Sequence, residues 1–574
     1  MSMNPLHSNT KRFIIYAIAF HGFIAILLGR LVYLQVVKYD FYKEKSEDQL
    51  KKVIRLYPHR GTIFDRNGVP LAITKASYSA FAIPTAIPNK AAFAAQVSEL
   101  LGMSYDQVYR RIEPNLAFIW IKRKLDKDTY QKLKALNIEG LDFIEEEKRI
   151  YPNGPMAAQV LGFVGIDNQG LGGLEYACDS DLKGSPGKII LEGDPRGFRI
   201  VSGTREVDPS YDGKHVVTTL DSYTQYVTQK FLREGIEENL AESGQAIVMD
   251  CKTGDILAMA SYPEFDPNHL ADSTERARRN ANVVDVYEPG SVFKIITLAG
   301  VLEEKIGRPD SAIYVPATLE IGTRTIHEAH AGSEGVRSIA EILKESLNVG
   351  TSLWAIKMGE KRFFPYILKF GFGQKTGIEL PAESAGLVRH PEQWSVPDIA
   401  MISFGHGIAV TPLQIIAAGN VIANKGTWVK PKIIDHLTDN THHLLRAPEK
   451  VERRDIISEK TAADMTQMMI GVVDKGTATS TKIPGFSIAG KTGTAQKVRR
   501  GGVGYEPGKY VASFLGFFPA NNPRFIVLVV TDSPQKSIWG STVACPIFKN
   551  IALSLIDHYD LKPDRPEEVL SLKN

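Results

Sequence analysis

The sequence predicts an α+β protein with a mixed antiparallel sheet flanked by helices, preceded by an elongated β-rich region and one N-terminal transmembrane helix. Three observations support this prediction. A single long apolar run covers residues 13–37. Strand and turn signals dominate residues 38–235. From residue 236 to 560, two strand candidates are followed by a long helical stretch, three more strand candidates and a helix. Such an order predicts one sheet with helices on its faces.

The composition is that of an ordinary globular protein. The 574 residues are 43% apolar and 23% charged, with a formal net charge of +3. This length allows two to four domains. No dense basic patch with interleaved aromatic residues is present, so no nucleic-acid partner is predicted.

The three cysteines are far apart in the sequence. Cys178, Cys251 and Cys545 follow no metal-ligand or redox spacing. An odd and sparse set argues against a disulfide framework. We expect three buried, small apolar side chains. A Cys251–Cys545 bridge stays open as an alternative, without support from the sequence.

The apolar run at residues 13–37 is long enough to cross a bilayer core, which needs about 20 residues. No small-residue cleavage site follows it, which favours an uncleaved signal anchor over a cleaved signal peptide. Lys11 and Arg12 precede the run, so residues 1–12 are expected in the cytoplasm. Everything from residue 38 on would then lie outside, in a compartment without ATP. A bond made there must draw its energy from a bond already present in the substrate.

The region at residues 38–235 begins with a recognisable hairpin. Residues 60–66 form a strand candidate that runs into an Asn67-Gly68 turn, with apolar residues resuming beyond it. We hypothesise that Arg60, Arg149 and Glu175 form buried charge pairs.

The second region, residues 236–560, starts with two strand candidates. Residues 245–250 and 256–261 flank a Lys-Thr-Gly turn and suggest an antiparallel hairpin. Residues 275–475 are predicted to be mostly helical. The remaining predicted elements are strands at 487–497, 511–518 and 525–531 and a helix at 546–558. The polar tail at 561–574 is expected to fray.

The segment Glu288-Pro-Gly-Ser291-Val-Phe-Lys294 carries the first candidate motif. Pro and Gly break the preceding structure and a helix is expected to start near Ser291. Lys294 would then lie one turn further on the same face, within reach of the Ser291 hydroxyl. A serine hydroxyl needs a base to become a nucleophile. A lysine can serve only when neutral, which costs roughly 4 to 5 kcal/mol near pH 7. Burial, a helix N-terminus and a second cation lower that cost.

The Ser-x-x-Lys spacing is weak evidence by itself. It also occurs at four other places in the chain: Ser8/Lys11, Ser180/Lys183, Ser185/Lys188 and Ser533/Lys536. What distinguishes Ser291 is the order of the motifs that follow. Ser346-Leu-Asn348 is expected within a helical stretch, where the Ser346 hydroxyl could relay a proton from Lys294 and Asn348 could hold a substrate amide.

The third candidate motif, Lys491-Thr492-Gly493-Thr494, is predicted on a strand. Lys491 would supply the second cation, and the hydroxyls of Thr492 and Thr494 could bind a substrate carboxylate. Gly493 has no side chain, so a substrate backbone could lie against the strand. The backbone N–H groups of Ser291 and Thr494 are candidates for an oxyanion hole.

These three motifs in this order resemble the penicillin-recognising serine enzymes. Further matches resemble the class B penicillin-binding proteins, closest to the division-specific, FtsI-like transpeptidases: Arg279-Asn280, Glu288-Pro-Gly-Ser291, Ser403-Phe-Gly-His-Gly407, Val410-Thr-Pro-Leu-Gln414 and the segment at 60–68. The resemblance runs from the anchor to about residue 557. His406 departs from the family, whose members often carry Tyr there.

The resemblance implies a reaction and its ligands. Ser291 would attack the penultimate D-Ala carbonyl of a peptidoglycan stem peptide and expel the terminal D-Ala, and an amine of a neighbouring stem would take the acyl group. β-Lactams would acylate Ser291. Residues 38–235 would be a non-catalytic pedestal of the dimerisation type. No cofactor and no metal are implied. The implied partners are a SEDS-type glycan polymerase, divisome membrane proteins and the cytoplasmic membrane, with the catalytic region in the periplasm.

Other functions stay open. The same superfamily contains elongation-type transpeptidases, D,D-carboxypeptidases and β-lactamases, and product analysis with an amine acceptor would separate hydrolysis from transfer. A β-lactam sensor or a divisome scaffold is a further alternative, tested by whether Ser291→Ala abolishes function. His327-Glu-Ala-His330 has i, i+3 spacing, which does not fit a zinc protease helix.

Overall fold

The computed structural model describes residues 6–192, 205–329, 332–499 and 504–571. These residues form two compact units. The smaller unit contains Met1–Pro58 with Gly184–Asp212, and the larger contains His59–Lys183 with Gly213–Asn574.

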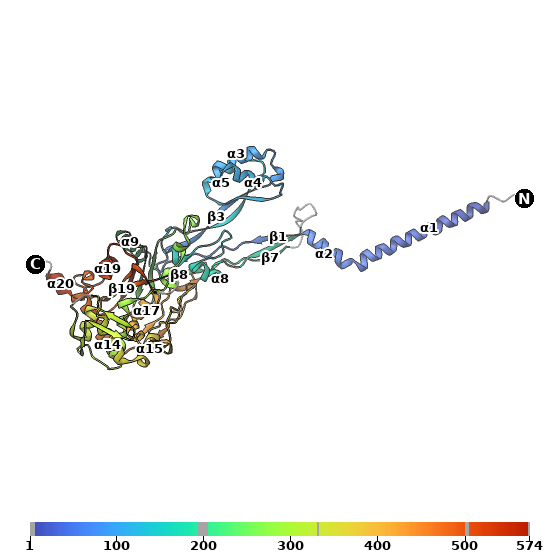
Figure 1. The fold of residues 1–574 in the computed structure, drawn as a ribbon. Coiled ribbons are helices and arrows are strands. Elements are labelled where there is room, and N and C mark those ends of the chain that lie inside the picture. The colour runs from blue at the N-terminus through green and yellow to red at the C-terminus, as the bar shows by residue number, and fades with distance from the viewer. Residues whose placement is uncertain (1–5, 193–204, 330–331, 500–503, 572–574) are drawn as a thin grey trace. The chain divides into compact units, whose positions relative to one another are not determined.

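The smaller unit begins with a long apolar helix. The apolar helix is α1 (Leu6–Val32), which continues into a π-helical turn (Tyr33–Val37). The polar helix α2 (Tyr39–Leu50) follows (Figure 1). The helical segment Thr10–Val37 is long and apolar enough to cross a membrane, with a mean hydropathy of 2.0. This agrees with the predicted span. The unit also holds a three-stranded antiparallel sheet of β1 (Lys51–Leu56), β6 (Gly187–Glu192) and β7 (Arg205–Asp208), in the order β1-β6-β7.

A seven-stranded sheet forms the first layer of the larger unit. Its order is β17-β16-β8-β2-β3-β4, and β5 pairs with β3. The bounds are β2 (Ile63–Phe64), β3 (Pro70–Ala82), β4 (Ile119–Leu125), β5 (Leu141–Ile150), β8 (His215–Thr218), β16 (Ile434–Thr438) and β17 (Leu444–Arg446). The predicted hairpin is confirmed: Gly68 turns the chain between β2 and β3 with φ of +81°, a conformation that glycine adopts without strain.

Three helices pack against the far end of β3, which the sequence analysis missed. They are α3 (Lys90–Leu101), α4 (Tyr105–Ile112) and α5 (Lys127–Ala135), grouped together in Figure 1. Each begins at a side-chain cap, from Asn89, Ser104 and Asp126 respectively. With β3, β4 and β5 they enclose a separate apolar core. The region is strand-rich as predicted, and these three short capped helices are an addition to that prediction.

The hypothesised buried charge pairs near the start of this unit are confirmed. Glu175 is fully buried, and its carboxylate accepts hydrogen bonds from Arg60 (2.8 Å) and from Arg149 (2.6 Å). Arg60 also pairs with Asp179 at 2.7 Å. The Tyr151 hydroxyl lies 3.4 Å from the same Glu175 carboxylate. Each charge in this group therefore has an opposite charge beside it.

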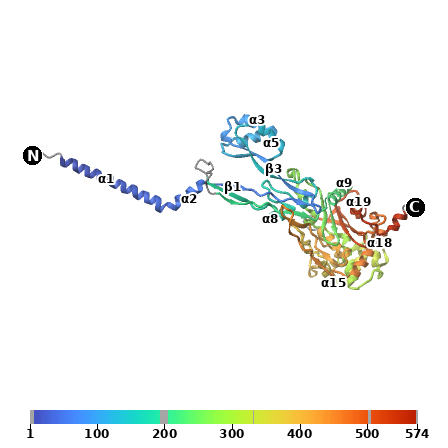
Figure 2. The same ribbon diagram turned by 180° about the vertical axis from the view of Figure 1, so that it is seen from behind.

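The second sheet of the larger unit contains all five predicted strands. Its order is β10-β9-β21-β20-β19, antiparallel throughout. The bounds are β9 (Ser243–Asp250), β10 (Ile256–Tyr262), β19 (Ala489–Val498), β20 (Tyr505–Phe518) and β21 (Phe525–Asp532). The neighbouring helices α9 (Ser222–Glu238) and α19 (Gly540–His558) pack on this sheet (Figure 2). Helix α17 (Pro412–Ala423) packs against β9, β20 and β21. The predicted sheet and its C-terminal helix are confirmed.

The stretch at 275–475 is less helical than predicted. Its main helices are α12 (Lys294–Glu303), α13 (Ile339–Glu345), α14 (Asn348–Met358), α15 (Glu360–Lys369), α16 (Asp398–Ser403), α17 and α18 (Glu459–Lys475). Short strand pairs interrupt them: β11 (Ala312–Val315) with β14 (Gly335–Ser338), β12 (Thr318–Ile321) with β13 (Arg324–His327), and β15 (Trp428–Val429) with β18 (Glu452–Arg453). Strands of two to four residues are too short to show alternation in a sequence.

The cysteines behave as expected. Cys178, Cys251 and Cys545 are all buried and free. No Cys251–Cys545 disulfide is formed.

Candidate active site

Ser291 lies in a 3-10 turn that leads directly into a helix. The turn covers Gly290–Phe293, and α12 begins at Lys294. Ser291 is half-buried, whereas Lys294 is completely buried. The predicted helix start near Ser291 is thus confirmed in position, with a tighter first turn than expected. The three-residue spacing is kept across the join, so both residues belong to one continuous helical segment.

Two glycines let other elements approach this turn closely. The backbone N–H of Gly290 donates to Gly405 O at 3.2 Å, and a Cβ on Gly405 would lie only 2.3 Å from Gly290 O. A Cβ on Gly493 of β19 would lie 2.9 Å from Val292. Atoms at such distances would overlap. Because Gly493 has no side chain, the turn that carries Ser291 can pack closely against β19. The sequence predicted a different role for Gly493, namely contact with a substrate backbone.

Ser346 lies between two helices. The prediction that the second motif lies within a helical stretch was wrong: α13 ends at Glu345, Ser346 has φ of +62°, and Asn348 is the first residue of α14. The left-handed conformation of Ser346 ends α13 and turns the chain into α14. The sequence does not indicate this helix break, because the left-handed residue that ends a helix is usually a glycine and here it is a serine. The break places Ser346 and Asn348 beside Lys294.

The side chains of the three motifs meet at Ser346. The Lys294 amine donates to Ser346 O, and to Asn348 Oδ1 at 2.8 Å, and lies 3.4 Å from Ser346 Oγ. The Lys491 amine donates to the same Ser346 Oγ at 2.8 Å. Ser346 Oγ therefore lies between two amines. Among the described residues, Ser291 Oγ makes no hydrogen bond to Lys294, whose donors point to the second motif.

The electrostatics of this cluster favour neutral amines. Burial lowers the pKa of Lys294 to about 7, and the charge of Glu328 opposes that shift. Burial also lowers the pKa of Lys491 well below its ordinary value, and the nearby Lys294 lowers it further. In the described part of the chain, neither lysine has a carboxylate within 4 Å. Burial in this fold therefore lowers the free energy needed to deprotonate Lys294 near neutral pH.

The third motif occupies β19, the last strand in the order of its sheet. Lys491 is completely buried, and Thr494 is half-buried. Thr492 Oγ1 lies 2.8 Å from Thr477 Oγ1, and Thr494 Oγ1 accepts from Gly540 N at 3.3 Å. An edge strand offers backbone groups to an added peptide. The predicted strand location of this motif is confirmed.

Several residues near the site were missed by the sequence analysis. Glu328 caps α14 from a distant loop, and Thr477 lies beside Thr492. The Glu288 carboxylate accepts from the Tyr505 hydroxyl at 3.0 Å and from Gly407 N at 2.8 Å. Each contact joins residues far apart in the chain, so no local sequence signal could have revealed it.

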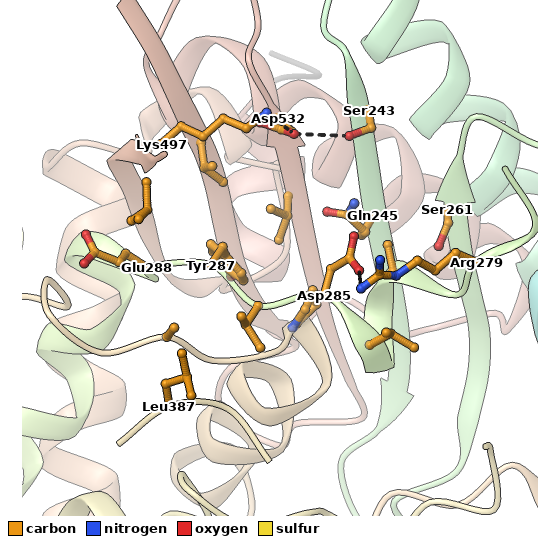
Figure 3. Close-up of a pocket in the computed structure, with 18 of the residues that line it drawn as sticks. Ser243, Gln245, Ser261, Arg279, Asp285, Tyr287, Glu288, Leu387, Lys497 and Asp532 are labelled. Carbon is orange, nitrogen blue, oxygen red and sulfur yellow. Dashed lines mark hydrogen bonds and ion pairs between the residues drawn. The ribbon is translucent and has the colours of Figure 1, made fainter. Parts of the chain in front are cut away.

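A cavity of about 1010 Å³ adjoins the segment that precedes Ser291 (Figure 3). Gln245 of β9, Lys497 of β19 and Val530 of β21 line it, together with Tyr287 and Glu288. None of the sequence-predicted site residues lines this cavity. It is therefore distinct from the meeting point at Ser346, although Glu288 belongs to the segment that leads to Ser291.

No group of three metal-binding side chains gathers among the described residues. The rejected zinc pattern falls partly on His330, which lies outside them. A serine hydroxyl near the start of a helix and a buried amine in the same helical segment are a nucleophile and a base of the kind that acyl transfer through a serine uses.

Comparison with known proteins places the chain in a family. Residues 244–553 match the penicillin binding protein transpeptidase domain, and residues 55–218 match the penicillin-binding protein dimerisation domain. The chain is 33% identical to stage V sporulation protein D of Bacillus subtilis (98% of this chain, 88% of that protein). It is 31% identical to the peptidoglycan D,D-transpeptidase FtsI of Escherichia coli (94% and 90%).

Solved structures agree. The crystal structure of penicillin binding protein 3 from Mycobacterium tuberculosis, complexed with aztreonam, has a TM-score of 0.71 and 29% identity over 89% of this chain and 99% of that chain. Two matched domains and a likeness over nearly the full length lead to one conclusion. The chain belongs to the penicillin-binding proteins, as a class B member with a dimerisation domain ahead of a serine transpeptidase domain.

Proposed function

We propose that this protein cross-links peptidoglycan stem peptides by acyl transfer through Ser291. The observation that carries the proposal is the pair of buried amines that meet at Ser346 without a carboxylate beside them in the described part of the chain. A neutral Lys294 takes the proton from Ser291 Oγ as this oxygen attacks the penultimate D-Ala carbonyl. The peptide bond to the terminal D-Ala breaks, and the proton passes through Ser346 to the leaving amine.

The second half of the reaction regenerates Ser291. The amine of a neighbouring stem attacks the ester, loses a proton to Lys294, and forms a new peptide bond. The energy comes from the peptide bond that was broken, so no cofactor is needed. The known alternative fate of the ester is attack by water. Product analysis with and without an amine acceptor distinguishes the two.

We assign the remaining predicted residues to substrate binding. Asn348 holds a substrate amide, and Lys491 is the second buried amine that donates to Ser346 Oγ. The hydroxyls of Thr492 and Thr494 bind a substrate carboxylate. Their placement on the edge strand β19 supports this assignment, because a stem peptide can extend along the strand. The N–H groups of Ser291 and Thr494 form the oxyanion hole.

We further propose where the protein acts. Residues 13–37, which lie within the apolar helical segment Thr10–Val37, are an uncleaved anchor in the cytoplasmic membrane, with residues 1–12 inside and the rest in the periplasm. Residues 38–235 serve as the pedestal and residues 236–560 as the catalytic region. The protein works in septal wall synthesis with a SEDS-type glycan polymerase and divisome membrane proteins. The likeness to FtsI supports the septal role.

Labelling with a fluorescent penicillin tests the proposal. Wild type is expected to form a covalent adduct that survives denaturing electrophoresis, and Ser291→Ala is expected to form none. Ser180→Ala is the matched control, because Ser180 heads another Ser-x-x-Lys match but is exposed in α8 (Asp179–Leu182). Retained labelling of Ser291→Ala would refute the assignment. A peptide map of the labelled wild type should place the adduct on Ser291.

A further inference from the structure

Glu328 caps the helix that carries Asn348, although it lies in a loop after β13. Its carboxylate accepts from the backbone N–H of Asn348 at 2.6 Å and from that of Val349 at 2.8 Å. These are the first two residues of α14, and the N-cap residue Leu347 supplies no side-chain hydrogen bond. The first N–H groups of a helix have no partner inside it. Glu328 therefore satisfies two donors that the local sequence leaves open.

The same loop also orients the Asn348 side chain. Asn348 Nδ2 donates to His327 O at 3.0 Å, and Asn348 Oδ1 accepts from the Lys294 amine at 2.8 Å. The amide nitrogen thus faces a backbone carbonyl and its oxygen faces Lys294, which fixes the orientation of the amide. Backbone and side chain of Asn348 are both held by two consecutive residues, His327 and Glu328.

Ser346 depends on the same anchor. It connects α13 to α14 in a left-handed conformation, two residues before Asn348. Its Oγ accepts from Lys491 and its carbonyl oxygen accepts from Lys294. A shift of the first turn of α14 would move these acceptors relative to both amines. The position of the proposed proton relay is therefore coupled to the Glu328 carboxylate.

Glu328 is also the negative charge that acts on Lys294. The groups that bear on Lys294 are the Lys491 amine from β19, His406 after α16, and Glu328 after β13. The charge of Glu328 raises the pKa of Lys294 and so opposes the effect of burial. It also counters the positive end of α14, which would otherwise lower that pKa further.

We propose that Glu328 is a positioning residue for acyl transfer, which holds Ser346 and Asn348 against Lys294 through the backbone N–H groups of α14. The inference rests on the function proposed above. It assigns a role to Glu328, whose carboxylate accepts from two backbone N–H groups of α14. The position and the charge of the carboxylate make separate contributions, and two substitutions separate them.

Glu328→Asp keeps the charge but shortens the reach by one methylene. Glu328→Gln keeps the reach, removes the charge and replaces one of the two accepting oxygens with an NH2 group that cannot accept. Glu320→Gln is the matched control, because Glu320 is exposed on β12 of the same hairpin. The measurement is the second-order rate constant for acylation of the full-length protein by a fluorescent penicillin, as a function of pH. A thermal melt of each variant confirms that it is folded.

Both Glu328 variants are expected to acylate about 10- to 100-fold more slowly at the pH plateau, because small displacements of positioned groups cost about that much. Only Glu328→Gln is expected to shift the acid limb, by about 0.5 to 1 pH unit towards lower pH. Glu320→Gln should match wild type. A folded Glu328→Gln variant with the wild-type rate and pH profile would overturn the inference about Glu328. In that case, loss of labelling in Ser291→Ala would still support the proposed function. Labelling that persists in Ser291→Ala would instead refute the proposed function.

Discussion

The larger unit buries two groups of ionisable side chains, and the two differ in whether opposite charges lie in contact. Around Glu175, two guanidinium groups surround one carboxylate, and Asp179 adds a second carboxylate. Around Ser346, two buried lysines share a hydroxyl, and neither has a carboxylate within 4 Å among the described residues. Both groups are removed from water, which is costly for any charge without a partner.

The difference shows what each group is for. Opposite charges hold each other in the charged state, so the Glu175 group binds distant parts of the chain together and stays fixed. The lysine group has no carboxylate in contact with it among the described residues, and the charge of Glu328 only partly opposes burial, which lowers the pKa of Lys294 to about 7. A site that must exchange a proton near neutral pH needs this lack of compensation. Stability is given up where chemistry takes place.

The largest expected effect comes from removing the base. Lys294→Met should lower the rate of penicillin acylation by about 1000-fold or more, since Ser291 then lacks the base proposed for it. The same variant should be more stable than wild type by about 1 to 3 kcal/mol, because a buried amine is replaced by an apolar chain of similar length. Stopped-flow acylation and chemical denaturation measure the two quantities.

The sign of the stability change has a pH signature. The folded-state pKa of Lys294 is about 7, below its ordinary value of 10.5. Between these values the unfolded chain binds more protons, so wild type gains stability as pH rises through this window. Lys294→Met should lose that slope. A variant that is less stable than wild type at pH 7 would contradict the view that this amine is under strain.

The opposite result is expected in the compensated group. Glu175→Gln should destabilise the protein by about 3 to 5 kcal/mol, because it leaves Arg60 and Arg149 buried with less negative charge. Asp560→Asn is the control: Asp560 pairs with Lys562 on the surface, where an ion pair contributes little. Chemical denaturation monitors both. The folded fraction of Glu175→Gln should still label with penicillin at the wild-type rate.

A smaller loss is expected from crowding the Ser291 turn. Gly405→Ala places a Cβ about 2.3 Å from Gly290 O, and Gly405 has φ of +83°, where alanine is strained. The expected destabilisation is about 1 to 3 kcal/mol, with slower acylation because the turn must move. Gly332→Ala also replaces a glycine of positive φ (+83°) but meets nothing within 4 Å, so it controls for backbone strain alone. Equal acylation rates in the two variants would argue against the contact.

The mildest test changes only the solution. Below about pH 7 the acylation rate of wild type should rise about tenfold per pH unit, and above it the rate should level off, because only neutral Lys294 accepts the proton from Ser291. A rate that stays flat from about pH 5 to 8 would remove Lys294 from the role of base.

Much of the fold could be read from the sequence because its signals are local. The five strands of the second sheet are long and apolar, and the Asn67-Gly68 turn is marked by its residues. The short strands between 275 and 475 could not be read, since their pairing comes from tertiary contacts rather than from pattern. The three sequence motifs also predicted which side chains meet at Ser346.

The arrangement within the site was harder to predict. The break at Ser346 depends on a left-handed residue that is not glycine, and the anchor at Glu328 depends on hydrogen bonds to residues 20 and 21 positions away. Glu328 also belongs to the His-Glu-Ala-His pattern at 327–330, and nothing in that pattern indicates a helix cap. Spacing can identify which residues act together, but the groups that hold them are found only in three dimensions.

The pairing of β16 with β8 has a consequence for how this chain is made. Residues 434–438 are synthesised more than two hundred positions after residues 215–218, yet the two strands are neighbours in one sheet. Because the chain is synthesised from its N-terminus, one edge of β8 stays unpaired until β16 has been made. Open strand edges invite pairing with other chains. Folding of this protein therefore includes a long interval in which the unpaired edge of β8 is exposed to aggregation, and chaperones that bind unpaired strands would matter most during it.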